Sequence, residues 1–457
     1  MTASRLSYGE ALQALESRGR FGIRLGLART RALLAGLGHP ERSFRGALIG
    51  GTNGKGSVLA LDGAALAAAG YRVGETPKPH LVTYRERLQI GGVPVEPDTF
   101  ARLAGDVLAL ADRVARRHGD PTEFELLTAV TFLWFAEAGV DLAVVEVGLG
   151  GRLDATHAWD GGVAAVTNVT LDHMDRLGST VEAIAREKAA IIMRGDRAVT
   201  GASGSALAVI ERRSRRVAAP LVVAPPARVL AVARDGIEVE LGRLGRVRVG
   251  LRGRHQAANV AVADAVLDAL ESAGIATVPD EARRTAYAAV RWPGRLELVE
   301  AGGREILLDG AHNPAGAASL AQALDEIGSF LRPGRSTLVL AVMADKDVDG
   351  VIGALAASIL LRGARVICTA PAGGRALSAD RLAARWLAVA GWQAEAVSEP
   401  AAALDAALSA APSDRGDGSG PVVVAGSLYL VGAARAILVS DPLLAPDPPI
   451  PHVEAVP

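Results

Sequence analysis

One stretch decides the fold: Gly50-Gly51-Thr52-Asn53-Gly54-Lys55-Gly56-Ser57. It follows a short apolar run, 47–49, and precedes an alanine-rich helical pattern over 58–69. The order strand, glycine-rich turn, lysine, hydroxyl and helix is typical of a phosphate-binding loop, because successive backbone N–H groups and the positive end of the helix point at one anion. The glycines let the backbone approach the phosphate, and Lys55 adds a mobile cation.

The loop departs from the strict P-loop pattern at two positions. Ile49 stands where that pattern has a glycine, and Gly56 stands where it has a hydroxyl. The stretch therefore predicts a nucleotide site of a variant type. The alternative is an ordinary glycine turn, which is disfavoured because Lys55 and Ser57 occupy positions that phosphate and metal need.

Composition bounds the class of protein. The 457 residues are too many for one ordinary core, half of them are hydrophobic, and the net charge is -1. This charge gives no sign of a nucleic-acid surface or of a membrane-seeking patch. The single cysteine, Cys368, excludes a disulfide framework and a cysteine metal cluster. With no apolar signal core in residues 1–20 and no membrane-length apolar run, we expect a cytoplasmic protein.

The chain alternates strand and helix patterns in two blocks, which predicts an α/β fold. The first block is a P-loop-type, mostly parallel sheet domain that ends in a small antiparallel meander over 228–251. The second block is a smaller Rossmann-like C-terminal α/β domain. The break at Trp292-Pro293-Gly294-Arg295 divides them, so we expect an ATP-binding domain over 1–296 and a second domain over 297–440. The proline-rich residues 441–457 are expected to form an extended, loosely held tail.

Acids and histidines follow several expected strands. Glu146 lies near the end of the apolar strand 142–148, where ligands of open α/β sheets bind, and carboxylate oxygens suit Mg²⁺. His173 and Asp154 are further candidates for metal or substrate contact. A turn-capping acid and a structural histidine are the alternatives.

Two further positions remain open from the residues alone. Lys188 lies on a helix among apolar neighbours, so it either extends outward to solvent or is buried for a reason. Asp309 and His312 follow a strand in the second block, before a helix opened by Pro314. A strand-end acid and histidine indicate a site, and a turn capped by Asn313 is the alternative.

Several stretches, taken in order, resemble the folylpolyglutamate synthase/dihydrofolate synthase family of the Mur ligase superfamily. They are the phosphate loop and Val145-Glu146-Val147-Gly148-Leu149-Gly150-Gly151-Arg152-Leu153-Asp154-Ala155-Thr156, Leu171-Asp172-His173-Met174, Glu187-Lys188-Ala189, Gln256-Ala257-Ala258-Asn259, Pro293-Gly294-Arg295-Leu296-Glu297, Asp309-Gly310-Ala311-His312-Asn313-Pro314 and Ala425-Gly426-Ser427-Leu428-Tyr429.

The resemblance implies roles for these positions. Glu146 and His173 match Mg²⁺ ligands, and Lys188 matches a catalytic lysine carried as a carbamate. Lys55 and His312 are the other catalytic candidates, with His312 near the acyl phosphate and the incoming glutamate. The nucleotide contacts are Asn53, Gly54, Lys55, Gly56, Ser57, Asn259, Arg295 and Asp309. The segments that match the pterin site are Thr122, Glu123, Phe124 and Glu125, with Arg152, Leu153 and Asp154, and a first loop at 23–25.

The resemblance also implies the reaction: an ATP-dependent ligase adds L-glutamate to dihydropteroate or to folates through an acyl phosphate. ATP and one or two Mg²⁺ ions are the implied cofactors, with a monovalent cation as a further candidate, and the protein is expected to be a monomer. One departure concerns the metal. The family usually has serine, a Mg²⁺ ligand, where this chain has Lys78, and a protonated lysine cannot ligate Mg²⁺. Another Mur-type ligase and a P-loop ATPase or regulator are the alternative functions.

Overall fold

The chain forms two compact units in a computed structural model, which describes residues 6–19, 26–371, 376–409 and 419–448. The first unit comprises residues 1–225, 261–286 and 443–457, and the second comprises 226–260 and 287–442. The chain therefore enters the first unit three times. This division into compact units does not test the functional division expected at 296/297, which stays a prediction.

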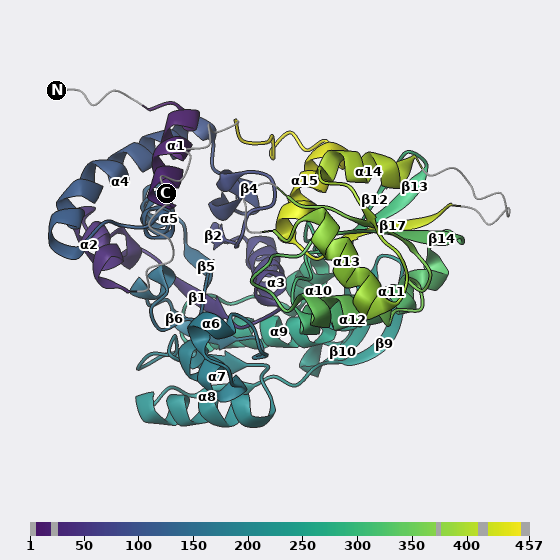
Figure 1. Ribbon diagram of the computed structural model, residues 1–457. Coiled ribbons are helices and arrows are strands. Elements are labelled where there is room, and N and C mark those ends of the chain that lie inside the picture. Colours follow the sequence, from purple (N-terminus) through teal and green to yellow (C-terminus); the bar gives the residue numbers. More distant parts are fainter. Residues whose placement is uncertain (1–5, 20–25, 372–375, 410–418, 449–457) are drawn as a thin grey trace. The chain divides into compact units, whose positions relative to one another are not determined.

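An eight-stranded sheet forms the centre of the first unit, in the order β4-β3-β2-β5-β1-β6-β7-β8 (Figure 1). Strands β2, β5, β1, β6, β7 and β8 are parallel, and β3 and β4 continue the sheet antiparallel beyond β2. The predicted mostly parallel sheet is thus confirmed. The strands are β1 (Arg45–Gly50), β2 (Val73–Thr76), β3 (Gln89–Ile90), β4 (Val93–Pro94), β5 (Leu142–Glu146), β6 (Gly162–Val166), β7 (Arg197–Thr200) and β8 (Leu221–Val223).

The register of the central strands determines where the site lies. β5 is a run of five buried residues between β2 and β1, as expected for a parallel strand covered on both faces. Ile49 of β1 pairs with Glu146, and Thr76 of β2 pairs with Val145. The carboxyl ends of three neighbouring strands therefore meet at one edge, which is the edge where open α/β sheets bind ligands.

Helices α1, α2, α4 and α5 pack on one another in the first unit (Figure 1). Beside them Phe44 contacts the rings of Phe132, Phe135 and Trp159, all buried. Full burial of such side chains contributes on the order of 2–3 kcal/mol each. The helices are α1 (Tyr8–Gly19), α2 (Ala28–Gly36), α3 (Lys55–Ala68), α4 (Pro97–His118), α5 (Glu123–Ala138), α6 (Met174–Leu177), α7 (Val181–Ala189) and α8 (Gly204–Val217), followed by α9 (Gln256–Ser272) and α10 (Asp280–Ala289), each of which has residues assigned to both units.

The second unit contains a six-stranded sheet and the predicted meander, which we expected at the end of the first block. The meander β9 (Arg228–Ala233), β10 (Gly236–Leu241) and β11 (Gly245–Val249) is antiparallel, as expected. The sheet has the order β12-β13-β17-β14-β15-β16 and is parallel except for β12. Its elements are β12 (Glu297–Ala301), β13 (Arg304–Leu308), β14 (Arg335–Leu340), β15 (Arg365–Cys368), β16 (Glu395–Ala396), β17 (Ser419–Ala425), α11 (Pro314–Ile327), α12 (Val348–Ala356), α13 (Ala379–Ala390), α14 (Pro400–Leu408) and α15 (Leu428–Leu438).

The end of the described chain is anchored, so the expectation of a loosely held tail is wrong for residues 443–448. Asp447 accepts hydrogen bonds from the Tyr8 hydroxyl, from the Thr83 hydroxyl and from the Tyr84 backbone N–H, at 2.6, 2.6 and 2.8 Å. The Arg85 guanidinium donates to the backbone oxygen of Leu443 at 2.8 Å. Both ends of this segment are thus held by the short 3₁₀ turn at Tyr84–Arg87 and its cap Thr83.

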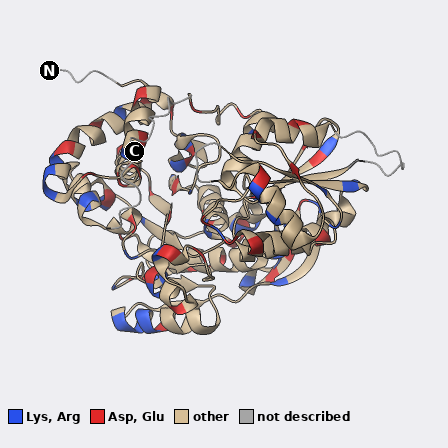
Figure 2. Cartoon of the chain, in the orientation of Figure 1, with Lys and Arg blue, Asp and Glu red and all other residues tan. Residues whose placement is uncertain are grey.

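Acidic and basic residues are mixed over most elements of both units, as the near-zero net charge leads one to expect (Figure 2). The carboxyl-terminal half of α8 is an exception, with four arginines at 212, 213, 215 and 216. No helix within the described ranges is both long enough and apolar enough to cross a membrane.

Candidate functional site

The phosphate loop joins β1 to α3 and is fixed by the segment after β6. Asn168 accepts hydrogen bonds from the backbone N–H groups of Thr52 and Asn53, each at 2.9 Å, and the Thr167 hydroxyl donates to the Asn53 oxygen at 2.7 Å. Gly51 has a φ of 139° and lies so close to Thr167 that a Cβ atom there would meet Oγ1 at 1.9 Å. Only glycine fits this position.

The amino end of α3 is open toward the loop. Gly54 is its N-cap with a left-handed φ of 83°, and no side chain caps the first turn. Lys55, Gly56 and Ser57 form that turn, and the Ser57 hydroxyl makes no hydrogen bond to any described residue. Because unpaired N–H groups and the positive end of the helix dipole point the same way, this turn is suited to bind a phosphate.

Lys55 and Glu146 lie together at the sheet edge. Lys55 Nζ donates to the Thr52 backbone oxygen at 3.0 Å and lies 3.9 Å from Glu146 Oε1. Glu146 is buried, as the last residue of β5. One carboxylate beside a phosphate site fits Mg²⁺, which is bound in such sites by one or two carboxylates together with phosphate oxygens and water. No group of three or more His, Cys, Asp and Glu side chains suited to a metal occurs in the part of the chain that the structure describes.

His173, the second predicted metal ligand, lies three residues after Thr170, which is hydrogen-bonded to Thr52 of the phosphate loop. It has a left-handed φ of 49° and serves as the N-cap residue of the short helix α6. Its backbone N–H donates to Asp172 Oδ1 at 2.9 Å, and its Nε2 lies 3.9 Å from the same oxygen. A non-glycine residue in this conformation is uncommon and is held there by its surroundings.

Lys188 is buried, which settles the choice that its sequence left open. Its ammonium nitrogen donates to the backbone oxygen of Gly51 at 2.8 Å, directly under the phosphate loop. Burial, followed by the neighbouring charge of Lys55, lowers the pKa of Lys188 to about 7, against the opposite effect of Asp172 and Asp154. A large share of this amine is therefore neutral near pH 7, and the neutral amine is the nucleophilic form.

Lys78 lies at the end of β2, next to Glu146. Its backbone N–H donates to Glu146 Oε2 at 2.9 Å, and its Nζ donates to the Glu146 backbone oxygen at 2.7 Å. The ammonium also lies 4.8 Å from the centre of the Phe124 ring, within the range of a cation–π contact. Burial lowers the pKa of Lys78 to about 8, while Asp154 and Glu146 act to raise it. The spacing of residues in the sequence did not predict these contacts, because they depend on the strand register.

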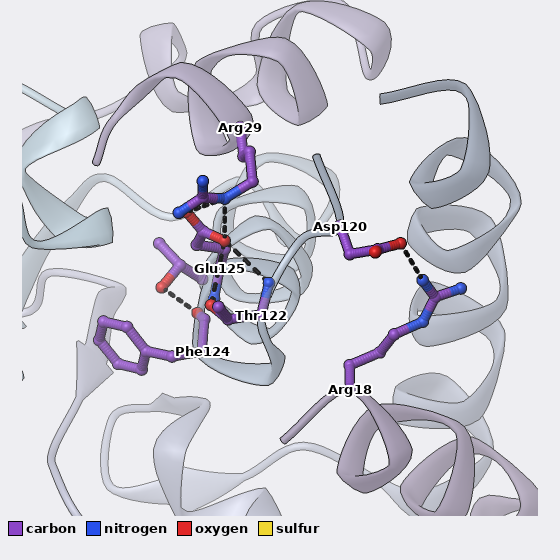
Figure 3. Close-up of polar contacts among 7 residues, drawn as sticks. Arg18, Arg29, Asp120, Thr122, Phe124 and Glu125 are labelled. Atoms are coloured by element: carbon purple, nitrogen blue, oxygen red, sulfur yellow. Dashed lines mark hydrogen bonds and ion pairs between the residues drawn. The ribbon is translucent and has the colours of Figure 1, made fainter. Parts of the chain in front are cut away.

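The segment 122–125 begins α5, and its predicted capping box is confirmed. Thr122 accepts from the Glu125 backbone N–H, and Glu125 Oε2 accepts from the Thr122 backbone N–H at 2.8 Å. Arg29 donates to both carboxylate oxygens of Glu125, while Arg18 bonds Asp120 nearby (Figure 3). Glu125 thus holds the helix start, and its substrate role stays a prediction.

The side chains of Glu123 and Phe124 contact different residues from those that Glu125 contacts. Glu123 accepts a hydrogen bond from the Tyr84 hydroxyl at 2.9 Å. The Phe124 ring packs so closely on Gly148 that a Cβ atom there would approach it to 2.7 Å. Tyr84, which contacts this predicted segment, was not singled out from the sequence, because its place in a turn of polar residues carried no distinguishing signal.

Arg152, Leu153 and Asp154 follow the glycines after β5. Asp154 is buried and accepts from the Leu149 and Thr156 N–H groups at 2.8 and 3.0 Å. Arg152 is exposed and pairs with Glu187 at 3.0 Å, and the Leu153 backbone oxygen accepts from Gly26 at 3.2 Å. The other predicted pterin loop, at 23–25, lies outside the described residues.

The remaining predicted residues gather in the second unit. Asp309 accepts from the backbone N–H groups of Leu296 and Ala311 at 2.9 and 2.8 Å, and the Gly310 N–H donates to the Gly294 oxygen beside Arg295. His312 Nδ1 lies 2.8 Å from the Gly310 oxygen. Asn259 donates to Gln256 at 2.7 Å.

His255 is a member of this second cluster that the sequence reasoning missed. Burial lowers the pKa of His255. The negative charge of Asp309 acts to raise this pKa, and the positive charge of Arg295 acts to lower it. The second unit also has a hollow of about 470 Å³ lined by residues of α11 and α12, among them Asp325 and Glu326, and none of the predicted site residues lines it. The structure therefore divides the predicted residues into two clusters, one in each unit.

Comparison with known proteins agrees with this arrangement. The Mur ligase middle domain matches residues 49–267, and the glutamate ligase domain of Mur ligases matches residues 294–428. A dihydrofolate synthase/folylpolyglutamate synthase of Mycobacterium tuberculosis is 36% identical over 91% of this chain and 90% of its own, and one of Bacillus subtilis is 35% identical over 76% and 82%.

Solved structures show the same fold. M. tuberculosis folylpolyglutamate synthase complexed with ADP and AMPPCP superposes with a TM-score of 0.85 and 33% identity, covering 94% of this chain and 99% of that one. The bifunctional folylpolyglutamate synthase/dihydrofolate synthase of Yersinia pestis, complexed with AMPPNP and a Mn ion, gives 0.79 and 30%, covering 96% and 100%.

A phosphate loop at the edge of a parallel sheet, followed by a second α/β unit with its own polar cluster, defines an ATP-dependent ligase of the Mur type. Within that class, the chain belongs to the dihydrofolate synthase/folylpolyglutamate synthase family.

Proposed function

We propose that the protein adds L-glutamate to dihydropteroate, to folates, or to both, at the cost of ATP. The observation that carries this proposal is the convergence, at one sheet edge, of the open amino end of α3, Lys55 and Glu146, beside the ring of Phe124 that Lys78 contacts. A loop suited to bind phosphate and an aromatic side chain suited to contact a pterin substrate therefore lie in the same unit. The names of the relatives from M. tuberculosis and B. subtilis supply the substrate class.

The reaction proceeds in two steps. A carboxylate oxygen of the pterin substrate attacks the γ-phosphorus of ATP, the bond between that phosphorus and the β–γ bridging oxygen breaks, and ADP leaves. The amine of glutamate then attacks the acyl carbon of the resulting acyl phosphate, phosphate leaves and the nitrogen loses a proton. Lys55 and the α3 backbone N–H groups neutralise negative charge on the transferred phosphoryl group.

Magnesium is the proposed metal, as one or two ions, with a monovalent cation as a further candidate. Glu146 and His173 are the residues that would hold Mg²⁺, and the ion would supply positive charge to offset the negative charge of the phosphate groups. The Mn ion of the Yersinia relative supports a divalent metal. Glu146 Oε2 already accepts the Lys78 N–H, so Oε1 is the oxygen that faces Lys55 and the phosphate loop.

Lys188 is proposed to act as a carbamate. The neutral amine attacks CO₂, a C–N bond forms and one proton is released, which converts the neutral amine into a carbamate anion beside the proposed metal site. The neutral fraction that follows from a pKa of about 7 supports this step, because a protonated amine has no lone pair for it.

The predicted nucleotide residues in the first unit are Asn53, Gly54, Lys55, Gly56 and Ser57, and those in the second unit are Asn259, Arg295 and Asp309. His312 is proposed to act near the acyl phosphate and glutamate. The pterin is proposed to contact Thr122, Glu123, Phe124, Glu125, Arg152, Leu153 and Asp154. The functional division into 1–296, 297–440 and the tail 441–457, a monomeric state and a cytoplasmic location complete the proposal.

The assay that tests the function follows ADP release with ATP, dihydropteroate and glutamate, each omitted in turn, and repeats it with tetrahydrofolate. The proposal expects release only with all three present. Equal release without the pterin would point to a simple ATPase instead. Product mass then shows whether glutamate has been joined, which separates this ligase from a Mur-type enzyme acting on another acceptor.

A further inference from the structure

A largely buried cation in the first unit, Lys78, makes no direct ion pair with a described residue, although the charges of Asp154 and Glu146 act on it from nearby. Lys78 Nζ makes one hydrogen bond, to the Glu146 backbone oxygen at 2.7 Å, and no other hydrogen bond or ion pair among the described residues. An ammonium group carries three N–H donors, so two remain available. A buried charge is costly unless it is paired, and the partial charges of a carbonyl and an aromatic face compensate only part of that cost.

The position of this ammonium is fixed from two sides. The backbone N–H of Lys78 donates to Glu146 Oε2 at 2.9 Å, and this holds the end of β2 against the end of β5. On the other side, the nitrogen lies 4.8 Å from the centre of the Phe124 ring at the start of α5. A cation held by backbone contacts is pre-organised, which reduces the entropy that a ligand must spend on ordering it.

The neighbours of the ammonium define what it can bind. The phosphate loop lies beyond Glu146, since Lys55 Nζ is 3.9 Å from Glu146 Oε1. The Phe124 ring and Gly148 form an apolar wall on the other side. An aryl carboxylate fits both, because its flat ring suits the apolar wall and its carboxylate suits the two remaining N–H donors.

We propose that Lys78 binds the carboxylate that is to be phosphorylated and so holds the acceptor substrate between Phe124 and the phosphate loop. This inference rests on the proposed function, because it takes the benzoate end of dihydropteroate as the ligand. Lys78 is thereby a substrate-binding residue. A bond from a charged donor to a carboxylate raises affinity by about tenfold to a hundredfold.

The test compares two ligands on two proteins. Dihydropteroate and an analogue with hydrogen in place of the carboxylate are titrated calorimetrically into the full-length protein with AMPPCP and Mg²⁺, and then into Lys78→Met. Wild type is expected to bind dihydropteroate at least about tenfold more tightly than the analogue, and Lys78→Met to bind both with similar affinity. Lys78→Gln, which keeps size and polarity without charge, is expected to lose the preference as well.

Controls make the outcome unambiguous. Arg117→Met, which removes an exposed cation from α4, should keep the preference. AMPPCP affinity shows that Lys78→Met is folded, and should be unchanged. A preference retained in both Lys78 variants, or an equal loss of affinity for both ligands, overturns the proposal. Wild type that binds AMPPCP and neither pterin overturns the proposed function together with it, whereas wild type that turns over with no carboxylate preference overturns the role of Lys78 alone.

Discussion

Lys188 Nζ donates a hydrogen bond to the backbone oxygen of Gly51, 137 residues earlier in the chain, at 2.8 Å. The bond places a lysine whose pKa is lowered to about 7 directly beneath the phosphate loop. Replacement by Met keeps the length of the side chain and removes the amine. We therefore expect Lys188→Met to lose most of its ligase turnover, by about a hundredfold or more.

Carbamylation of Lys188 has its own measurement. Wild-type protein equilibrated with ¹³C-bicarbonate should show a protein-bound carbamate signal by NMR, and Lys188→Met should lack it. The neutral amine predominates only above the pKa of about 7, so the signal at fixed dissolved CO₂ should grow between pH 6 and pH 8. A wild-type spectrum without the signal over this range would remove the carbamate from the mechanism.

Lys55→Ala should reduce turnover by about a hundredfold or more, because it deletes the cation closest to the proposed phosphoryl group. Nucleotide affinity, measured by titration with AMPPCP, should fall as well. Arg117→Met removes an exposed cation from α4 and is expected to leave both quantities unchanged. Normal turnover in Lys55→Ala would contradict the assignment of the phosphate loop.

Gly51→Ala should abolish nucleotide binding even though it adds a single methyl group. Its Cβ would lie 1.9 Å from Thr167 Oγ1, and the φ of 139° disfavours any side chain. Gly105→Ala is the matched control, since it lies inside α4 with its nearest neighbour at 3.9 Å. Alanine is the better helix former, so the control should unfold at a slightly higher temperature and bind AMPPCP normally.

Glu75 predicts a pH dependence of stability. It is buried under α3, and burial raises its pKa from 4.5 to about 7, against the hydrogen bond from the Gly92 N–H at 2.7 Å. The folded state thus holds this proton more tightly than the unfolded state. The contribution of Glu75 to the free energy of unfolding is therefore fully present below pH 4.5 and is lost as the pH rises to about 7. It amounts to roughly 3 kcal/mol. Urea unfolding at pH 5 and pH 8 should show a smaller decrease for Glu75→Gln than for wild type.

Asp447→Ala should loosen the turn at Tyr84–Arg87. The variant leaves the Tyr8 and Thr83 hydroxyls and the Tyr84 N–H without their acceptor, at a cost on the order of 1–3 kcal/mol. We expect faster tryptic cleavage after Arg87, identified by mass spectrometry, and a lower urea midpoint. Asp405→Ala, at an exposed position of α14, provides the control for loss of an acid, and similar cleavage in both variants would refute the anchoring role.

Local patterns predicted the parts of the fold that depend on local chemistry. The glycine-rich loop, the apolar strand β5 and the Thr122–Glu125 capping box each occupy a few consecutive residues, and all are present as expected. Local patterns gave no clear signal for the strand β12, because Glu297 and Glu300 interrupt its apolar residues and it pairs with β13 through the turn at Gly302-Gly303. Contacts that join distant residues had no local signal: Asp447 bonds Thr83 across 364 positions.

The candidate site likewise contains some positions that local sequence predicts and others that depend on contacts between distant residues. Positions such as Glu146 could be predicted because a strand end identifies them. The burial of Lys188 and the contacts of Lys78 could not, since each depends on the register of strands and on which helix face turns inward.

The first unit consists of three segments of the chain, and its last described contacts come from residues 443–448. During synthesis, the amino-terminal 225 residues therefore leave the ribosome before the parts of α9 and α10 that complete their unit, and well before Asp447. The turn next to the proposed substrate segment acquires its anchor only when the second unit has been made in full. Tags, fusions or truncations at the carboxyl terminus consequently act on the unit that begins the chain, not on the unit that immediately precedes them in sequence.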